Sequence, residues 1–260
     1  MTNFHKYHGA GNDFILINNL KGEINFDTEY IKFLCNRHLG VGADGLILLE
    51  SSNKADCFMN YYNSDGTLAE MCGNGIRCSA QFYIEQTDAI ITELNIDTRA
   101  GIKKITVNND NTYSVNMGLP AFNGPDFPSG ELNIEGLPFE CVSMGNPHAV
   151  MIQDTLDSFD ILTIGPEVEN DYHFPNKINV EFVEKINDDY FKVKVWERGC
   201  GATLACGTGA CAVYAVLKKK DDNLKEITLD FPGGKLYLSE NEKGEIILRG
   251  PATFVFKGEI

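Results

Sequence analysis

Two cysteines occupy matching glycine-flanked turns, each at the start of a run with helical periodicity. Cys72 lies within Met71–Gly75, whose sequence is MCGNG, and Cys206 lies within Ala205–Gly209, whose sequence is ACGTG. The exposed N–H groups and positive dipole end of a helix start favour an anion, so a thiol placed there becomes a thiolate more readily. A single cysteine before a helix is more often a small buried residue than a catalyst. The occurrence of two such turns favours a chemical role for both thiols.

The two turns belong to an internal repeat. The residue numbers of Cys72 and Cys206 differ by 206 − 72 = 134, and three further landmarks recur at the same offset. This offset sets Gly145-Asn146 over Gly11-Asn12, residues 179–184 over residues 45–50, and residues 196–199 over residues 62–65. Four landmarks at one offset indicate duplication of one fold, and therefore two similar domains.

Two thiols that face each other across one carbon atom suit the inversion of a stereocentre. One thiolate removes a proton, and the other thiol delivers a proton to the opposite face. Ligands favour the interface between domains, so we expect the site in an interdomain cleft. Backbone N–H groups at the two turns would hold a substrate carboxylate as its charge grows; these belong to Gly73, Asn74, Gly207 and Thr208.

Other polar residues recur near strand ends and turns that would line such a cleft: Asn12, Asn63, Asn146 and Asn179. Asparagine in a turn usually serves its own backbone geometry, so each is weak evidence alone. Arg198 is suited to hold a carboxylate with its planar fork, and Glu197 could bind an ammonium group or assist Cys206. The alternative for this pair is a surface ion pair. His148 is the matching candidate to assist Cys72.

Composition limits the classes of function. The chain has 260 residues, 43% of them hydrophobic, and a net charge of −15, which argues against nucleic acid or an anionic membrane as a partner. It has no apolar run of about 20 residues and no apolar signal segment at its start, so we expect a cytoplasmic protein with reduced cysteines. Cys200, Cys206 and Cys211 lack the spacing of a metal site, and no metal is expected.

Periodicity and turn residues predict a fold of the α+β class. Each half is expected to be a mixed, largely antiparallel sheet wrapped around a central helix. Helices are predicted near residues 27–38, 73–86, 156–162 and 207–220, and residues 118–138 have the proline and glycine content of a linker. We expect an N-terminal domain over residues 1–117, completed by the strand at residues 251–260. The duplicated C-terminal domain then spans residues 118–250.

The chain resembles the diaminopimelate epimerase family along its whole length. The matching segments are residues 9–14 (GAGNDF), 63–66 (NSDG), 71–78 (MCGNGIRC), 144–148 (MGNPH), 179–180 (NV), 197–199 (ERG) and 204–211 (LACGTGAC). The resemblance implies a cofactor-independent isomerase that interconverts LL- and meso-2,6-diaminopimelate, on the route to lysine and peptidoglycan. It also implies a homodimer.

On this resemblance, Cys72 and Cys206 are the catalytic pair, and His148 and Glu197 assist them. The substrate-binding positions are Asn12, Asn63, Gly73, Asn74, Asn146, Asn179, Glu197, Arg198, Gly207 and Thr208. The chain departs from the family at Gly45, where many members have Gln, and at Ala202, where many have Glu. Three alternatives stay open: a proline or hydroxyproline racemase, a non-catalytic binding module of the same fold, and a redox switch formed by Cys72 and Cys206.

Overall fold

The computed structural model describes residues 1–88, 90–157 and 159–260, and the chain divides into two compact units. Unit 1 comprises Met1–Val115 together with Gly250–Ile260, and unit 2 comprises Asn116–Arg249. Strands β7 (Thr112–Gly118) and β16 (Ile246–Pro251) straddle the boundaries between them. The C-terminal segment therefore returns to the unit that holds the N-terminus.

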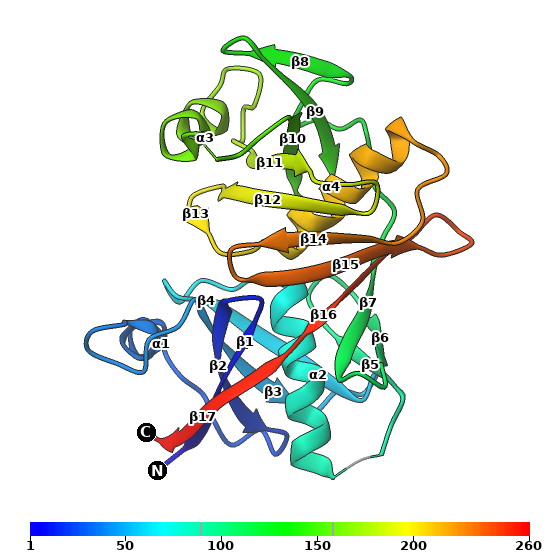
Figure 1. The fold of residues 1–260 in the computed structure, drawn as a ribbon. Helices are drawn as coiled ribbons and strands as arrows, with labels where there is room; N and C mark the ends of the chain where they lie inside the picture. Colours follow the sequence, from blue (N-terminus) through cyan, green and yellow to red (C-terminus); the bar gives the residue numbers. More distant parts are fainter. Residues whose placement is uncertain (89, 158) are drawn as a thin grey trace. The chain divides into compact units, whose positions relative to one another are not determined.

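Unit 1 is a mixed, largely antiparallel sheet around helix α2. Apart from β7 and β16, its elements are β1 (Asn3–Gly9), β2 (Asn12–Asn19), α1 (Thr28–Cys35), β3 (Gly45–Glu50), β4 (Cys57–Asn63), α2 (Gly73–Thr87), β5 (Glu93–Asp97), β6 (Lys103–Val107) and β17 (Thr253–Glu259). β2–β3 and β4–β5 are parallel pairs, whereas β17–β1, β1–β2, β3–β4 and β5–β6 are antiparallel. Every residue from Gly73 to Ala80 is buried, so the first half of α2 is enclosed, whereas its last turn, which includes Glu85 and Thr87, is partly exposed (Figure 1).

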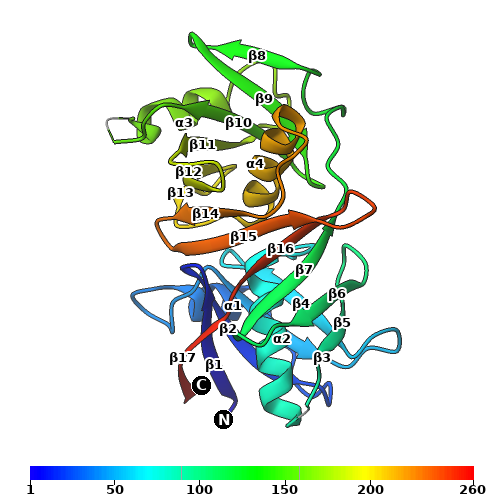
Figure 2. The same ribbon diagram turned by 45° about the vertical axis from the view of Figure 1, so that its right-hand side comes forward.

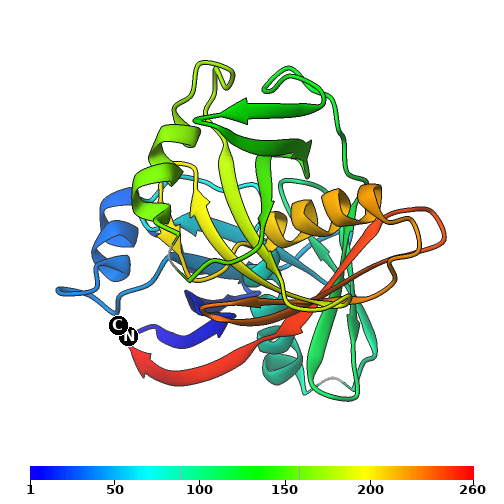
Figure 3. The same cartoon turned by 45° about the horizontal axis from the view of Figure 1, so that its top comes forward.

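Unit 2 has the same architecture around helix α4. Its elements are β8 (Glu131–Ile134), β9 (Leu137–Ser143), β10 (Pro147–Gln153), α3 (Ile161–Glu169), β11 (Asn179–Lys185), β12 (Tyr190–Glu197), β13 (Gly201–Thr203), α4 (Gly207–Lys220), β14 (Ile227–Phe231) and β15 (Gly234–Glu240). β10–β11 and β12–β14 are parallel, and the other neighbouring pairs are antiparallel. α4 packs on β9, β10 and β11, and every residue from Gly209 to Leu217 is buried (Figure 3).

The repeat predicted from the sequence is present in the strand register. In unit 1, Phe14 pairs with Gly45 across β2 and β3. In unit 2, His148 pairs with Asn179 across β10 and β11, so both partners are shifted by the offset of the repeat. The first residues of helices α2 and α4 are separated by this offset as well. The expected α+β fold with two similar halves is therefore confirmed.

The two ends of the chain lie side by side in unit 1. Thr2 and Ile260 exchange two backbone hydrogen bonds, of 2.8 and 3.0 Å. From there β17 pairs antiparallel with β1, beginning with Asn3 opposite Glu259 (Figure 2). The sheet of unit 1 thus contains the first and the last strand of the sequence.

Two local predictions differ from the structure. Helix α3 covers Ile161–Glu169 rather than residues 156–162, of which residue 158 lies outside the described residues. Its start is set by Asp160, whose side chain accepts hydrogen bonds from two N–H groups of the first turn. Residues 118–138 include strand β8, which joins β9 through Glu135 and Gly136; both have positive φ, as a tight hairpin turn requires.

Candidate active site

Cys72 is the N-cap of α2. Its backbone is extended, and its Sγ accepts a hydrogen bond from the Gly75 N–H at 3.5 Å. A Cβ atom on Gly75 would lie 3.1 Å from Met59 Cε and 3.2 Å from Ile47 Cδ1, so these two side chains would have to shift by a few tenths of an ångström. The glycine lets the first turn of the helix pack against β3 and β4. This packing leaves Cys72 partly exposed at the helix start.

Two asparagines, Asn12 and Asn74, form hydrogen bonds close to Cys72. Asn12 Oδ1 lies 3.4 Å from Cys72 Sγ and accepts a hydrogen bond from Asn74 Nδ2 at 3.2 Å. The Nδ2 group of Asn12 donates to Asp44 Oδ2 at 2.7 Å, which fixes the orientation of the amide. The structure therefore brings together three of the residues predicted for this half of the site.

Arg77 is a residue of this region that the sequence analysis did not select. It is fully buried in α2, where its guanidinium donates to Gly73 O at 2.8 Å, Asn74 Oδ1 at 2.8 Å and Pro251 O at 3.1 Å. These contacts tie the cysteine turn to the C-terminal segment. An arginine between Ile76 and Cys78, in a helical run with no other charge before Glu85, was the available signal.

Cys206 is the N-cap of α4 and is only 5% exposed. Its Sγ accepts from the Gly209 N–H at 3.4 Å and lies 3.4 Å from Thr208 Oγ1. Burial raises the pKa of the Cys206 thiol well above its usual value, and the Glu197 and Glu181 carboxylates raise it further. These surroundings favour the protonated thiol.

Glu197 lies at the end of β12 and contacts Cys206 directly. It accepts hydrogen bonds from the Cys206 thiol and from the Thr203 hydroxyl. Burial raises the pKa of Glu197, although these two hydrogen bonds act in the opposite direction. A buried carboxylate in contact with a thiol is suited to exchange a proton with it, which fits the predicted auxiliary role.

His148 lies on β10 and is fully buried. Its Nδ1 is 2.7 Å from Glu181 Oε1 on β11, and its Nε2 is 3.2 Å from Asn146 Oδ1. Asn146 Nδ2 in turn donates to Thr208 Oγ1 at 3.3 Å. Within unit 2, His148 is therefore connected to the turn that carries Cys206. Glu181 was not selected from the sequence; an acidic residue inside the apolar strand Asn179–Lys185 was the available signal.

The remaining predicted binding residues lie near strand ends. Asn179 Nδ2 donates to Pro147 O at 2.8 Å, and Asn179 Oδ1 accepts from the Arg198 N–H at 3.0 Å. The Arg198 guanidinium donates to a backbone carbonyl at residue 176, at 3.1 Å. Asn63 donates to Thr67 Oγ1 at 3.0 Å within the turn that follows β4. Asn63 is therefore held within its own turn, whereas Asn179 and Arg198 are held by segments that are distant in the sequence.

The two departures from the family pattern have different surroundings. A Cβ atom on Gly45 would lie 2.6 Å from both Tyr61 Cε2 and Tyr62 O, so Tyr61 occupies the space that a longer side chain would need. Ala202 is exposed on β13, where it pairs with Trp196. A substituent at residue 202 therefore has room, whereas one at residue 45 requires both the Tyr61 side chain and the backbone at Tyr62 to move.

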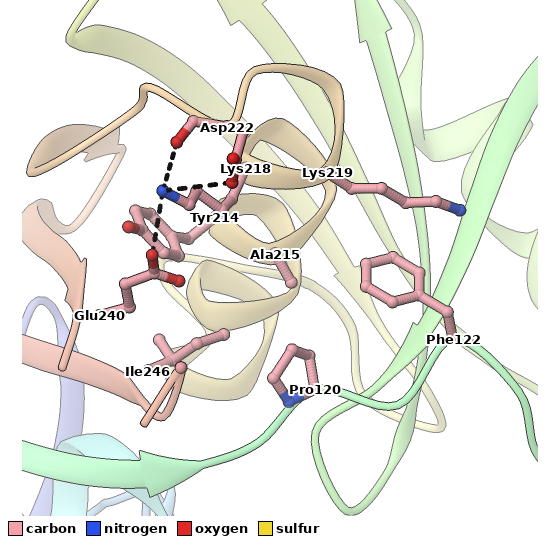
Figure 4. A pocket seen from close by; sticks show the side chains of 10 residues that line it. Pro120, Phe122, Tyr214, Ala215, Lys218, Lys219, Asp222, Glu240 and Ile246 are labelled. Atoms are coloured by element: carbon pink, nitrogen blue, oxygen red, sulfur yellow. Dashed lines mark hydrogen bonds and ion pairs between the residues drawn. The ribbon is translucent and has the colours of Figure 1, made fainter. Parts of the chain in front are cut away.

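A cavity of about 330 Å³ lies at the other end of α4 from Cys206 (Figure 4). Its lining includes Lys218, whose Nζ pairs with Glu240 at 2.9 Å and donates to the backbone carbonyl of Asp222 at 2.7 Å. The charge of Lys218 is therefore already matched by protein groups. Across the described ranges, no cluster of three or more potential metal ligands is found. In the same ranges, no helix is both long and apolar enough to cross a membrane.

Comparison with known sequences identifies the family. The chain matches the family model described as diaminopimelate epimerase over residues 4–122 and 140–255. A diaminopimelate epimerase of Gloeothece citriformis is 42% identical, with 98% of this chain and 97% of the relative aligned. That of Carboxydothermus hydrogenoformans is also 42% identical, with 98% of each chain aligned.

Solved structures show how widely the fold is shared. A PhzF-family phenazine biosynthesis protein of Bacillus anthracis has a TM-score of 0.71 at 16% identity, over 100% of this chain and 98% of its own. A hydroxyproline epimerase from Agrobacterium vitis has a TM-score of 0.71 at 13% identity, over 99% and 91%. These likenesses concern the fold alone, whereas the sequence matches are close and nearly complete. The chain therefore belongs to the diaminopimelate epimerase family and is an isomerase that acts as an amino-acid epimerase.

Proposed function

We propose that this chain interconverts LL- and meso-2,6-diaminopimelate, with Cys72 and Cys206 as the two acid–base groups. One observation carries the proposal. α2 and α4 begin at equivalent positions of the repeat, each is capped by a cysteine, and each Sγ accepts the N–H of the third residue of its helix. Duplication has thus placed a thiol at the same point of two similar units. A reaction that uses two acid–base groups needs two such thiols.

The reaction requires one thiolate and one thiol. The thiolate takes the proton from the α-carbon, and the carbanion then takes a proton from the other thiol on its opposite face. The stereocentre is inverted, one thiol and one thiolate are present again with their positions exchanged, and no electrons are gained or lost. No cofactor is needed for this balance. The second amino-acid end of the substrate undergoes no reaction and serves recognition.

Each half supplies groups for the substrate in this proposal. The N–H groups of Gly73, Asn74, Gly207 and Thr208 face the reacting carboxylate, with Asn12 and Asn146 beside them. Asn63, Asn179, Glu197 and Arg198 recognise the remaining polar groups. Glu197 assists Cys206, which its hydrogen bond to that thiol supports. His148 assists Cys72.

The site is proposed to lie in a cleft between two domains. The first would span residues 1–117, completed by 251–260, and the second residues 118–250. The two compact units found in the structure and the common register of their strands support this division. A cytoplasmic location is proposed because the chemistry needs reduced thiols, which that compartment maintains.

A homodimer is also proposed. β17 exposes three consecutive large apolar residues, with exposed fractions of 42% for Phe254, 50% for Val255 and 45% for Phe256. Such a contiguous apolar patch is unusual on the surface of a monomeric protein. A second copy of the chain would cover them. Sedimentation velocity should give twice the monomer mass, and Phe256→Lys should lower the proportion of dimer; a monomer at micromolar concentration would refute the proposal.

The activity is tested with unlabelled LL-diaminopimelate in D₂O. We expect loss of the α-proton signal by NMR together with formation of the meso isomer, with L-proline and trans-4-hydroxy-L-proline as control substrates. Turnover of proline or hydroxyproline alone would favour a racemase of the same fold, and turnover of none of these substrates would favour a binding module. Full activity of an oxidised enzyme that contains a Cys72–Cys206 disulfide would favour a redox switch.

A further inference from the structure

Glu181 is a fully buried carboxylate with no role in the reaction described so far. It lies in the middle of β11, and its Oε1 is 2.7 Å from His148 Nδ1. Its Oε2 is buried without a hydrogen-bond partner among the described residues. Such a group lowers stability unless its surroundings compensate for its lost hydration.

Packing alone does not explain Glu181. The repeat places Ile47 at the equivalent position of β3 in unit 1. Ile47 is fully buried and packs beside Gly75, as Glu181 packs beside Gly209. An apolar side chain therefore fills this place in one unit, whereas the other unit keeps a carboxylate that is costly to bury.

The carboxylate also depends on the helix that carries Cys206. A Cβ atom on Gly209 would lie 2.4 Å from Glu181 Oε1, so only glycine leaves room for the carboxylate as it stands. The N–H of the same glycine donates to Cys206 Sγ. Glu181 therefore lies against the backbone that holds the thiol.

A chain of polar contacts leads from Glu181 to Cys206. Glu181 Oε1 to His148 Nδ1 is 2.7 Å, and His148 Nε2 to Asn146 Oδ1 is 3.2 Å. Asn146 Nδ2 to Thr208 Oγ1 is 3.3 Å, and Thr208 Oγ1 to Cys206 Sγ is 3.4 Å. An ionised Glu181 Oε1 would accept from an Nδ1–H group of His148, and Nε2 faces Asn146 Oδ1, which is also an acceptor.

We propose that Glu181 is a positioning residue, which fixes the ring orientation of His148 and, through Asn146 and Thr208, the polar surroundings of Cys206. A carboxylate behind a histidine has this effect in other enzymes, where it sets the tautomer and the direction of the reactive nitrogen. The proposal rests on the proposed function, because it assumes that His148 and Cys206 take part in the reaction.

Three variants test the role of Glu181. Glu181→Met removes the acceptor and keeps the approximate size. We expect kcat to fall about 10–100-fold with KM changed less than about twofold, by analogy with the loss of a partner that orients a metal-bound histidine. Glu181→Gln keeps a carbonyl oxygen for Nδ1–H, so it should retain most of the activity. Glu184→Gln is the matched control, because Glu184 is buried on the same strand and accepts from Leu156 N at 2.8 Å.

The ¹⁵N and ¹H resonances of the His148 ring supply an independent readout in the full-length wild-type enzyme. A proton on Nδ1 is expected, and its absence would overturn the proposal even if Glu181→Met did not fold. Wild-type kcat in folded Glu181→Met would also overturn it. Equal losses in the Met and Gln variants would show that the charge, not the hydrogen bond, matters, which would likewise contradict it.

The same experiments separate this proposal from the proposed function. If the wild-type enzyme did not turn over diaminopimelate, the proposed function would fail. The protonation of the His148 ring would still report whether Glu181 fixes it. If turnover is observed and the Nδ1 proton is absent, only the positioning role of Glu181 is lost.

Discussion

The two cysteine turns have similar backbone conformations but differ in the charged groups that lie near them. In both units a cysteine caps a helix, the third residue of the helix is a glycine whose N–H faces Sγ, and an asparagine lies nearby. In α2 the guanidinium of Arg77 is buried beside the cysteine turn, and the equivalent position in α4 is Cys211. Beside α4 lies the carboxylate of Glu181; the equivalent position beside α2 is Ile47.

This difference shows which properties the duplicated fold preserved. The position of each thiol depends on helix capping and glycine packing, which both units retain. The proton affinity of each thiol depends on its neighbours, and these have diverged. The carboxylates of Glu197 and Glu181 raise the pKa of Cys206, whereas the cysteine turn of unit 1 is held by a cation. Similar geometry thus coexists with different electrostatics.

The largest expected effect comes from removing either thiol. Cys72→Ala and Cys206→Ala should each lower kcat in both directions by at least about 10²–10⁴-fold, because every turnover uses both groups. Chiral chromatography of the LL and meso isomers measures the loss. Cys57→Ala, in the core of unit 1, is a control that should stay active. If one of the two thiol variants kept a tenth of the activity, the halves would not be equivalent in function.

Substitutions at Arg77 and at Cys211, which occupy equivalent positions in the two units, should lower the free energy of unfolding by different amounts. Arg77→Met leaves three acceptors without this donor, and each unsatisfied buried group costs about 1–3 kcal/mol, so we expect the free energy of unfolding to fall by about 3 kcal/mol or more. Cys211→Ala should cost about 1 kcal/mol, since it removes one small buried side chain. Urea denaturation compares the two, and equal losses would contradict the difference described here.

The carboxylate beside Cys206 should control the reactivity of that thiol. Glu197 raises the pKa of Cys206, so Glu197→Gln should lower it and increase the thiolate fraction below that pKa. We expect iodoacetamide to alkylate Cys206 faster at pH 8 in the variant than in the wild type, because more of the thiol is ionised. Peptide mass spectrometry measures each cysteine separately, with Cys72 as an internal control. Slower alkylation of Cys206 would reverse the assigned electrostatic effect.

A smaller effect should appear in acid. Burial acts to raise the pKa of Asp13, but hydrogen bonds from Arg37 and Lys6 outweigh it and hold the pKa below its ordinary value. The stabilisation is therefore present above the unfolded pKa of about 3.9 and is lost as the pH falls through the lower folded value. Asp13→Asn should cost about 1 kcal/mol at pH 7, with the difference from wild type shrinking toward pH 2. Unit 2 has Pro147 at the equivalent position and offers no counterpart.

Urea titrations of Asp13→Asn and wild type at pH 7, 4 and 2.5 measure this difference. Asp160→Asn is a suitable control, because Asp160 also has a lowered pKa but is an exposed helix cap in unit 2. A constant difference between Asp13→Asn and wild type at all three pH values would show that the Asp13 charge is not the cause.

The features that the sequence predicts well are those recorded in short segments. The starts of α2 and α4 are correct because the cysteine, the glycines and the apolar periodicity are all local. The repeat is visible because both copies kept the same spacing. Helix α3 was placed too early because its apolar residues continue into the preceding loop, and only the Asp160 cap marks the true start.

The features that the sequence does not predict depend on contacts between distant segments. Arg77 reaches the carbonyl of Pro251, which is 174 residues away, and Glu181 reaches His148, 33 residues away. Charged residues are rarely fully buried, so a reader of the sequence places both at the surface. Only the fold shows that each has a partner inside its unit.

The return of β17 to the first unit affects the order in which the chain can fold during synthesis. Residues 116–249 form one continuous stretch, so every segment of unit 2 has been made before residues 250–260 are added. Most of unit 1 is translated before unit 2, but β1 lacks β17 and Arg77 lacks the Pro251 carbonyl until residues 250–260 have been made. Unit 1 is thus begun before unit 2 and completed after it, and a chain that stops before residue 251 lacks one of the contacts that hold the Cys72 turn.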